Sequence, residues 1–201
     1  MTEHERALSG RLFAPRCREL KEIKHKAHSI CQKFNMLDEW DEERKDLTDR
    51  LLGSHGERVV FQGPIQFNYG CNTHIGNEFF ANFNFTVLDD NTVNIGDNVL
   101  IGPNVSIMAA NHPLYAKQRE EMTYPDDHVS ISEYAKPVNI GSHVWIGCGS
   151  VICDGVTIGD GAVIGAGSVV TKDIPSGWLA YGVPCVPVRE ITENDRKEDL
   201  M

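Results

Sequence analysis

The chain has 201 residues, of which 24% are charged and 41% hydrophobic, and its formal net charge is −10 at pH 7. This length allows one substantial core with an appendage, and the composition is that of an ordinary globular protein. The negative charge argues against a general binder of nucleic acid or anionic membranes, and the sequence has no apolar run long enough to span a bilayer.

The N-terminal residues, MTEHERALSG, include no apolar signal segment, so we expect a cytoplasmic protein. The eight histidines show no strong metal pattern, and no metal is expected. His25 and His28 could share a helix face and hold a metal, but a solvated helix face is the preferred interpretation. No CxxC pair occurs, and the six cysteines are therefore interpreted as reduced thiols: Cys17, Cys31, Cys71, Cys148, Cys153 and Cys185.

Residues 1–57 are predicted to be a helical segment. One amphipathic helix is indicated by apolar residues that fall on one side of a 3.6-residue period: Leu20, Ile23, Ala27, Ile30 and Phe34. A second helix is indicated by Trp40, Leu47 and Leu51. Asp38 is its expected N-cap, and Gly53 is its expected C-terminal stop.

Residues 58–190 have a different texture, because aliphatic residues recur there at every sixth position. The longest register is Ile140, Ile146, Ile152, Ile158, Ile164 and Val170. Small or β-branched residues stand four places after each of these. Two shorter registers, Ile95–Ile101–Ile107 and Ile75–Ala81–Val87, are offset from one another by two residues around positions 89–92.

A fixed period of six predicts a parallel β-helix, in which three hexads close one triangular coil of about 18 residues. The aliphatic side chain points inward and stacks on its counterpart in the next coil, and the Gly or Asn after it permits the turn. A sandwich of short strands is the alternative, but it needs no shared phase over six hexads. The predicted fold class is therefore an all-β solenoid, followed by a polar tail at residues 191–201.

The hexad register breaks between Ile107 and Ile140, and the intervening residues 113–137 are polar and proline-containing. A long irregular loop within a repeat is usually functional or disordered. It opens with Asn111-His112-Pro113. A histidine at the root of a loop suits a general base, because imidazole can accept a proton near neutral pH. The other interpretation is that His112 only hydrogen-bonds the loop to the coil.

Several longer stretches resemble the galactoside and maltose O-acetyltransferases: "SGRLF", "ANFN", "NHP", "VWIG", "VVTKDIP" and "GVPC", in this order. The hexapeptides alone would be a weak functional signal, but this ordered set covers nearly the whole chain. The resemblance implies a left-handed coil and transfer of acetyl from acetyl-CoA to a sugar hydroxyl. It also implies a homotrimer with sites between subunits. An amino sugar or a xenobiotic such as an antibiotic is the alternative acceptor.

The resemblance also assigns roles to residues. His112 would be the general base, Asn82 would lie beside it, and the main-chain N–H of Cys148 would donate to the oxyanion. The acceptor would be bound by Asn68, Asp90 and Trp145. Apart from the resemblance, Glu133 in the long loop is expected to help bind the acceptor and to orient the imidazole. Acetyl-CoA would be bound by Ala166, Thr171, Lys172 and Arg189. Each of these residues also has a structural interpretation. Asn82 would hydrogen-bond the coil backbone, Asp90 would form a corner turn, and Trp145 would be a structural residue on the prism. The residues assigned to CoA would be ordinary surface residues.

Some positions depart from the family pattern. Pro15 stands where galactoside-type members have an Asp that grips the sugar, and Val186 stands where they have a second Arg near CoA. The loop is also longer, by "MTYPDDHVSIS". Phe79 and Phe85 are expected in the core, whereas Phe80 and Phe83 would face a neighbouring subunit.

Two other functional classes fit the sequence less well. A metal enzyme of the carbonic anhydrase type would need three convergent histidines, but His74, His112 and His143 lack the spacing. A purely structural solenoid would leave the NHP motif, the loop and the TKDIP segment unexplained.

Overall fold

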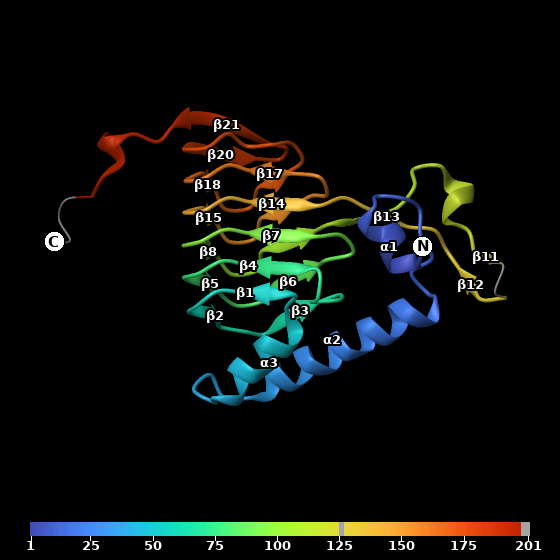
Figure 1. The fold of residues 1–201 in the computed structure, drawn as a ribbon. Helices are drawn as coiled ribbons and strands as arrows, with labels where there is room; N and C mark the ends of the chain where they lie inside the picture. Colours follow the sequence, from blue (N-terminus) through green and yellow to red (C-terminus); the bar gives the residue numbers. More distant parts are fainter. Residues whose placement is uncertain (125–126, 198–201) are drawn as a thin grey trace.

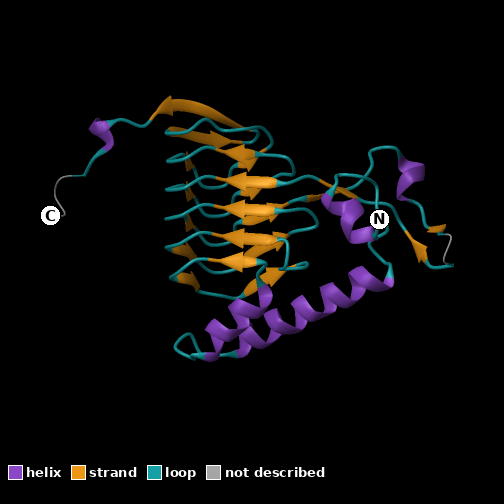
Figure 2. Cartoon of the chain, viewed as in Figure 1, coloured by secondary structure: helices purple, strands orange, loops and turns teal. Residues whose placement is uncertain are grey.

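The structure is a computed structural model that describes residues 1–124 and 127–197. A triangular β-solenoid carries helices at its N-terminal end and a long excursion at one corner, while the C-terminal segment extends away from the prism (Figure 1). Figure 2 shows the helices across the base of the prism and beside the excursion. Within the described residues no helix is both long and apolar enough to cross a membrane.

Three α-helices form the N-terminal segment: α1 (Glu3–Leu8), α2 (Arg18–Met36) and α3 (Glu43–Leu51). The helix predicted from Leu20 and the residues that follow it is α2. Leu20, Ala27, Ile30 and Phe34 are buried, and Ile23 packs at the edge of a smaller core cluster. The apolar stripe of α2 therefore closes the N-terminal end of the prism.

The start of α3 differs from the prediction. The helix begins at Glu43, and the Asp38 carboxylate instead accepts a hydrogen bond of 3.0 Å from the backbone N–H of Trp40. Trp40 lies outside the helix with 85% of its surface exposed. The predictions that Asp38 caps the helix and that Trp40 belongs to it were therefore wrong. The Asp38 carboxylate forms a local turn and is not available as a helix cap.

Gly53 follows the end of α3 by two residues and starts the solenoid. Its N–H donates to the carbonyl of Thr73 in the next coil. A Cβ at this position would lie 2.2 Å from the carbonyl oxygen of Cys71, so only glycine fits. The helix thus stops where the backbone must pass against the coil above it.

The solenoid has three sheets. Sheet one contains β1 (Ser54–His55), β4 (Thr73–Ile75), β7 (Val93–Ile95), β14 (Val138–Ile140) and β17 (Thr157–Ile158). Sheet two contains β2 (Val59–Phe61), β5 (Phe79–Ala81), β8 (Leu100–Ile101), β15 (Trp145–Ile146), β18 (Val163–Ile164), β20 (Trp178–Gly182) and β21 (Cys185–Glu190). Sheet three contains β3 (Ile65–Phe67), β6 (Phe85–Leu88), β9 (Ser106–Met108), β16 (Val151–Ile152) and β19 (Val169–Val170).

Strand pairing within the three sheets is parallel, apart from the antiparallel β20–β21 hairpin that ends the coil. The predicted hexad residues stack on one another: Ile95 pairs with Ile140, Ile101 with Ile146, and Ile107 with Ile152. These side chains are buried in one continuous core. The parallel β-solenoid predicted from the six-residue period is therefore confirmed.

Phenylalanines fill the wide N-terminal end of the core. Phe61 packs against Phe67, Phe79 and Phe85 with ring centroids 5.6–6.2 Å apart. Phe79 and Phe85 are buried as predicted, whereas Phe83 is half exposed on the outer surface.

Coil length is not uniform. Twenty residues separate Ser54 from its partner His74, whereas the predicted eighteen separate Asn139 from Thr157. In the second coil the added residues form the corner after sheet three, where buried Asp89 accepts from the N–H of Tyr69 and the hydroxyl of Thr73. The offset between the early registers is therefore a structured corner.

The long excursion leaves the third coil at this same corner, and it is folded. It contains β10 (Ala110–Asn111), the 3₁₀ turn Ala116–Arg119, β11 (Met122–Thr123), β12 (Val129–Ser130) and β13 (Tyr134–Ala135). β10 pairs with β13 and β11 with β12, both antiparallel. The long loop predicted after the His112 coil is present, and it is ordered by these short strand pairs and by a bridge between Phe13 of the N-terminal segment and Glu133. Residues 125–126 of this loop, like 198–201 of the tail, lie outside the described residues.

Candidate functional site

Successive coils bring polar side chains to the corner that follows sheet three. Asn68 follows β3, Asp90 follows β6, and His112 follows β10. The Asn68 amide donates to a carboxylate oxygen of Asp90 at 2.8 Å. Glu133 enters the same corner from the returning arm of the excursion. The structure thus brings together four of the predicted site residues, and we call them the loop-corner cluster.

His112 faces Glu133, with Nε2 and Oε1 3.8 Å apart. The imidazole is 50% exposed, whereas the carboxylate is only 17% exposed. Asn111 fixes the backbone at this point, since its side-chain oxygen accepts from the N–H of His112 at 2.8 Å. The Asn111 amide in turn donates to Asp154 at 2.8 Å. Asn111 is a positioning residue that the sequence analysis missed, although it is part of the NHP motif.

Burial makes the carboxylates of the cluster weaker acids than usual. It raises the pKa of Asp90 to about 6, and the hydrogen bond from Asn68 only partly opposes this. Burial also raises the pKa of Glu133, against the opposing effect of His112. Asp90 Oδ1 and the hydroxyl of Tyr69 are buried without a hydrogen-bond partner among the described residues. A polar ligand at this corner would therefore find both hydrogen-bond acceptors and a donor.

Helix α2 adds basic side chains to this corner, which the sequence did not reveal. The Lys24 ammonium lies 5.3 Å from the centroid of the Tyr69 ring. It also lowers the pKa of both Asp90 and Glu133 against the stronger effect of burial. His25 and His28 are exposed, as expected for a solvated helix face, and Asn68 is near enough to His28 to oppose the lowering of its pKa by burial.

A second set of predicted residues lines an apolar groove of about 700 Å³ on the outer face of sheet two. Asn82, Trp145, Cys148 and Ala166 lie in it. Trp145 is 54% exposed. The coils are closely stacked here, because a Cβ on Gly147 would come within 2.6 Å of the backbone nitrogen of Ala166. The groove is thus a smooth wall that can accommodate a long, flexible chain.

The two sets lie at different corners of the same chain. Asn82 follows β5 and Cys148 follows β15, both at the exit of sheet two, whereas His112 lies at the exit of sheet three. In Figure 1 the excursion that carries β13 projects from one side of the prism, and β5, β8 and β15 lie toward the other. A single chain therefore does not bring Asn82 and Cys148 into the loop-corner cluster.

The residues predicted to contact the phosphates of CoA lie at the C-terminal end. Thr171 and Lys172 are exposed just after β19. Arg189 on β21 donates to both carboxylate oxygens of Asp195, at 2.8 and 2.6 Å. This pairing lowers the pKa of Asp195 to about 2. The Arg189 guanidinium is thus held by an acid of its own chain, which the sequence analysis did not foresee.

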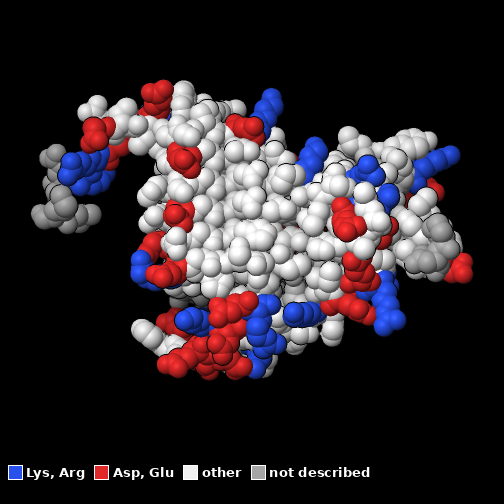
Figure 3. Space-filling model, viewed as in Figure 1, with Lys and Arg blue, Asp and Glu red and all other residues white. Residues whose placement is uncertain are grey.

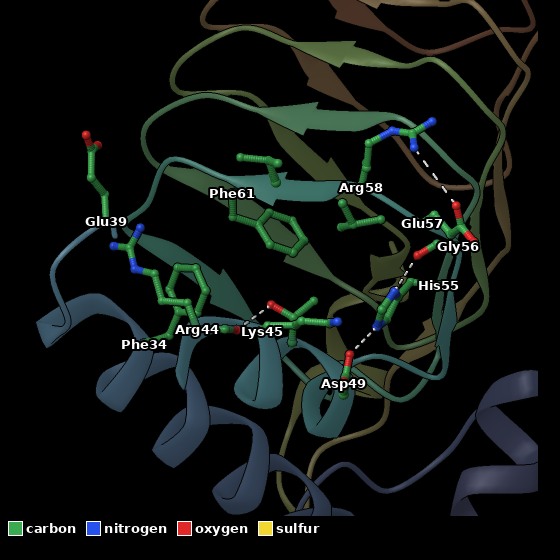
Figure 4. Close-up of a pocket in the computed structure, with 13 residues that line it drawn as sticks. Phe34, Glu39, Arg44, Lys45, Asp49, His55, Gly56, Glu57, Arg58 and Phe61 are labelled. Carbon is green, nitrogen blue, oxygen red and sulfur yellow. Dashed lines mark hydrogen bonds and ion pairs between the residues drawn. The ribbon is translucent and has the colours of Figure 1, made fainter. Parts of the chain in front are cut away.

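A further cavity of about 600 Å³ lies between α3 and β2 (Figure 4). Its floor includes Phe34 and Phe61, and none of the predicted site residues lines it. His55 hydrogen-bonds Asp49 at 2.7 Å, and Arg58 pairs with Glu78. The charges at its rim are thus largely engaged with one another.

The three histidines weighed for a metal site are not gathered into a ligand set. His74 hydrogen-bonds Ser54 at 2.8 Å on sheet one, away from the corner of His112. Within residues 1–124 and 127–197 no group of three or more His, Cys, Asp or Glu side chains is arranged to hold a metal ion.

Comparisons with known proteins agree with this architecture. Residues 137–172 match the family "Bacterial transferase hexapeptide (six repeats)", and residues 6–56 match the "Maltose acetyltransferase hexapeptide capping motif". The galactoside O-acetyltransferase of Escherichia coli K12 is 44% identical over 197 residues, which cover 98% of this chain and 92% of that enzyme.

Solved structures show the same likeness. A galactoside acetyltransferase in complex with coenzyme A superposes with a TM-score of 0.88 at 43% identity, covering 97% of this chain and 94% of that one. A maltose O-acetyltransferase from Clostridium difficile 630 also gives 0.88, at 41% identity and with 96% and 99% covered. The fold is therefore the left-handed parallel β-helix of the hexapeptide repeat.

Proposed function

We propose that this chain acetylates a sugar hydroxyl with His112 as general base. The chain belongs to the galactoside and maltose O-acetyltransferase family of hexapeptide-repeat acyltransferases, and the proposal starts from this membership. Acetyl-CoA is the co-substrate of this O-acetyltransferase family. The observation that carries the assignment of the base is the placement of His112. Asn111 fixes it at the root of the excursion, where it faces Glu133 beside buried polar groups.

In the proposed reaction His112 removes the proton from the acceptor hydroxyl while the hydroxyl oxygen bonds to the acetyl carbon. The C–S bond then breaks, and the proton passes from His112 to the CoA thiolate. Proton transfer of this kind contributes roughly a hundredfold to ten-thousandfold to the rate. The buried Glu133 carboxylate, 3.8 Å from Nε2, would orient the ring and stabilise its protonated form.

The apolar groove on sheet two would hold the pantetheine arm. Ala166 lines its floor, and Trp145 would cover the reacting thioester from the side. The main-chain N–H of Cys148, beside Gly147, is the proposed oxyanion donor, so no acyl-thiol intermediate is needed. Thr171, Lys172 and Arg189 would contact the phosphates, because cations suit these groups on a protein of negative net charge.

We further propose a homotrimer in which each site is shared by two subunits. His112 and the pair Asn82–Cys148 lie at different corners of one prism, so a neighbouring prism must supply the missing half. The half-exposed side chains of Leu100 and Trp145 line the apolar groove that such packing would cover. The cytoplasmic location expected from the sequence remains a prediction.

The general base is tested with His112→Ala. Release of CoA thiol is measured with a panel of glycosides, amino sugars and antibiotics, and Gln32→Ala on the exposed face of α2 is the matched control. We expect the first variant to lose more than about 99% of the activity and the control to keep most of it. Retention of more than about a tenth by His112→Ala would refute the assignment.

Shared sites are tested by co-expressing His112→Ala with Asn82→Ala. If each site combines His112 of one subunit with Asn82 of the next, mixed trimers regain up to about a quarter of the wild-type sites. The same two variants mixed as preformed, non-exchanging oligomers serve as the control. Activity that stays at the level of the control would show that each subunit works alone.

A further inference from the structure

A basic pocket lies beside the loop-corner cluster and has no part in the function proposed above. It has a volume of about 470 Å³ and is lined by Arg16, Arg18, Lys21, Glu22, His25 and His128. The first five come from the segment that enters α2, and the last comes from the excursion. Five of the six lining side chains are basic, in a chain whose net charge is −10.

Not all of these cations are engaged by carboxylates. Arg16 pairs with Glu121, and Arg18 pairs with Glu22 at 2.7 Å. Among the described residues, no carboxylate lies within ion-pair distance of the Lys21 ammonium or of Lys24 one helical turn away. The pocket thus retains positive charge that its own acids do not neutralise.

The pocket adjoins the corner where His112 lies. Arg16 and Lys24 both lower the pKa of Glu133, so they flank this carboxylate. The backbone N–H of Arg16 donates to Ser130 in the excursion at 3.2 Å, and Phe13 pairs with Glu133. Lys21, Lys24, His25 and His28 continue the basic stripe along α2 as far as Asn68. The basic pocket is therefore next to the loop-corner cluster.

The acidic side chains of the loop-corner cluster lie deeper in the protein than the basic side chains of the pocket. Asp90 is buried and the Glu133 side chain is only 17% exposed, while Arg16, Lys21 and His25 are exposed. Pro15, which is buried next to Arg16 in the chain, adds no carboxylate to this region. An anionic group would be repelled from the inner carboxylates and attracted to the outer cations.

We infer that the acceptor is a saccharide carrying a carboxylate, sulfate or phosphate group, which is held by Lys21 and His25 while a hydroxyl reaches His112. This inference rests on the proposed function, because it names the acceptor class of the same site. The anion orients the sugar, and the hydroxyl to be acetylated lies on the side that enters the loop-corner cluster.

The test compares kcat/KM for methyl glucoside, methyl glucuronide, glucose 6-phosphate and glucose 6-sulfate, with acetyl-CoA saturating. The three anionic arms distinguish which group is preferred. The variants are Lys21→Gln and Lys21→Glu, and Lys33→Gln on the same helix is the matched control. We expect the preferred anionic sugar to exceed methyl glucoside at least about tenfold, and Lys21→Glu to remove that advantage. The advantage should also shrink as salt is added.

Activity with methyl glucoside should change less than about twofold in either Lys21 variant. Equal use of neutral and anionic sugars, or an anionic preference unaffected by Lys21→Glu, would overturn the inference and leave the proposed acetyl transfer intact.

A binding measurement separates the two proposals if no sugar is acetylated. Calorimetric titration of His112→Ala with methyl glucuronide and the two glucose 6-esters needs no turnover. We expect at least one to bind, and to bind about tenfold more weakly when Lys21→Glu is added. Affinity that is the same with and without Lys21→Glu, or no binding at all, would overturn the inference.

Discussion

Replacing Asp90 with Asn should make the protein more stable at neutral pH. Asp90 is fully buried, and one of its carboxylate oxygens has no hydrogen-bond partner among the described residues. Its pKa rises from the ordinary 3.8 to about 6 on folding, chiefly because burial disfavours the charged form. Between these two pH values the folded chain binds a proton that the unfolded chain does not.

The sign of the effect follows from this difference. The stability of the wild type falls as pH rises from about 4 to about 6, and the full penalty remains above that range. A shift of about two units corresponds to roughly 3 kcal/mol. The side chain introduced by Asp90→Asn carries no charge, and its amide oxygen can still accept from Asn68. The variant should therefore gain up to about 3 kcal/mol relative to wild type between pH 4 and pH 7.5.

The assay is urea unfolding followed by far-ultraviolet circular dichroism, at several pH values and one fixed subunit concentration. Asp46→Asn, which removes an exposed carboxylate on α3, is the control and should leave the pH dependence almost unchanged. A stability difference between Asp90→Asn and wild type that is equal at pH 4 and pH 7.5 would refute the reasoning.

Three other outcomes are expected. Ile146→Ala empties part of the fully buried column in sheet two and should cost about 2–5 kcal/mol, measured by denaturant unfolding against the exposed Val60→Ala. Gly147→Ala should raise the KM for acetyl-CoA and lower the melting temperature, because its Cβ would meet the backbone of Ala166; an unchanged KM and melting temperature would contradict this. Asp195→Asn removes the carboxylate that holds Arg189 and should lower the KM for acetyl-CoA, whereas Arg189→Ala should raise this KM. Both KM values are measured by initial-rate kinetics. Equal values in the two variants would contradict the proposed phosphate contact.

The repeating core could be predicted from the sequence because its inward positions accept only aliphatic side chains. Ile101 and Ile146 are six-residue markers in the sequence and direct neighbours in sheet two. The N-terminus of α3 could not be predicted in the same way. An Asp before an apolar run fits both an N-cap and a local turn, and Asp38 forms the turn with Trp40.

The candidate site was predictable only in part, for a related reason. Asn68, Asp90, Glu133 and His112 follow recognisable motifs, but Lys24 joins them only because α2 docks across the end of the prism. The partner of Arg189 likewise depends on the local turn that follows β21. Such contacts depend on how separate elements pack together, and they produce no repeating pattern in the sequence.

Charged side chains are distributed unevenly over the molecule. In the view of Figure 3 the broad face over sheet one is almost free of them, while acids and bases gather on the helices below and around the excursion. On sheet one, Asn94 and Asn139 form a side-chain hydrogen bond of 2.9 Å between coils. Such amide ladders satisfy their own polar groups and leave little net charge for other molecules to recognise.

The extra residues of the second coil and the whole excursion emerge at one vertex of the triangle. Material added there lengthens the circuit of a coil without shifting the pleats of the strands above and below, since Ile95 still meets Ile140 and Ile107 still meets Ile152. These insertions in the solenoid thus share one corner and leave the stacking of the coils unchanged. Grafting a different hairpin between Pro113 and Ser132, which keeps His112 and Glu133, should therefore change which acceptor is acetylated while leaving the groove on sheet two undisturbed.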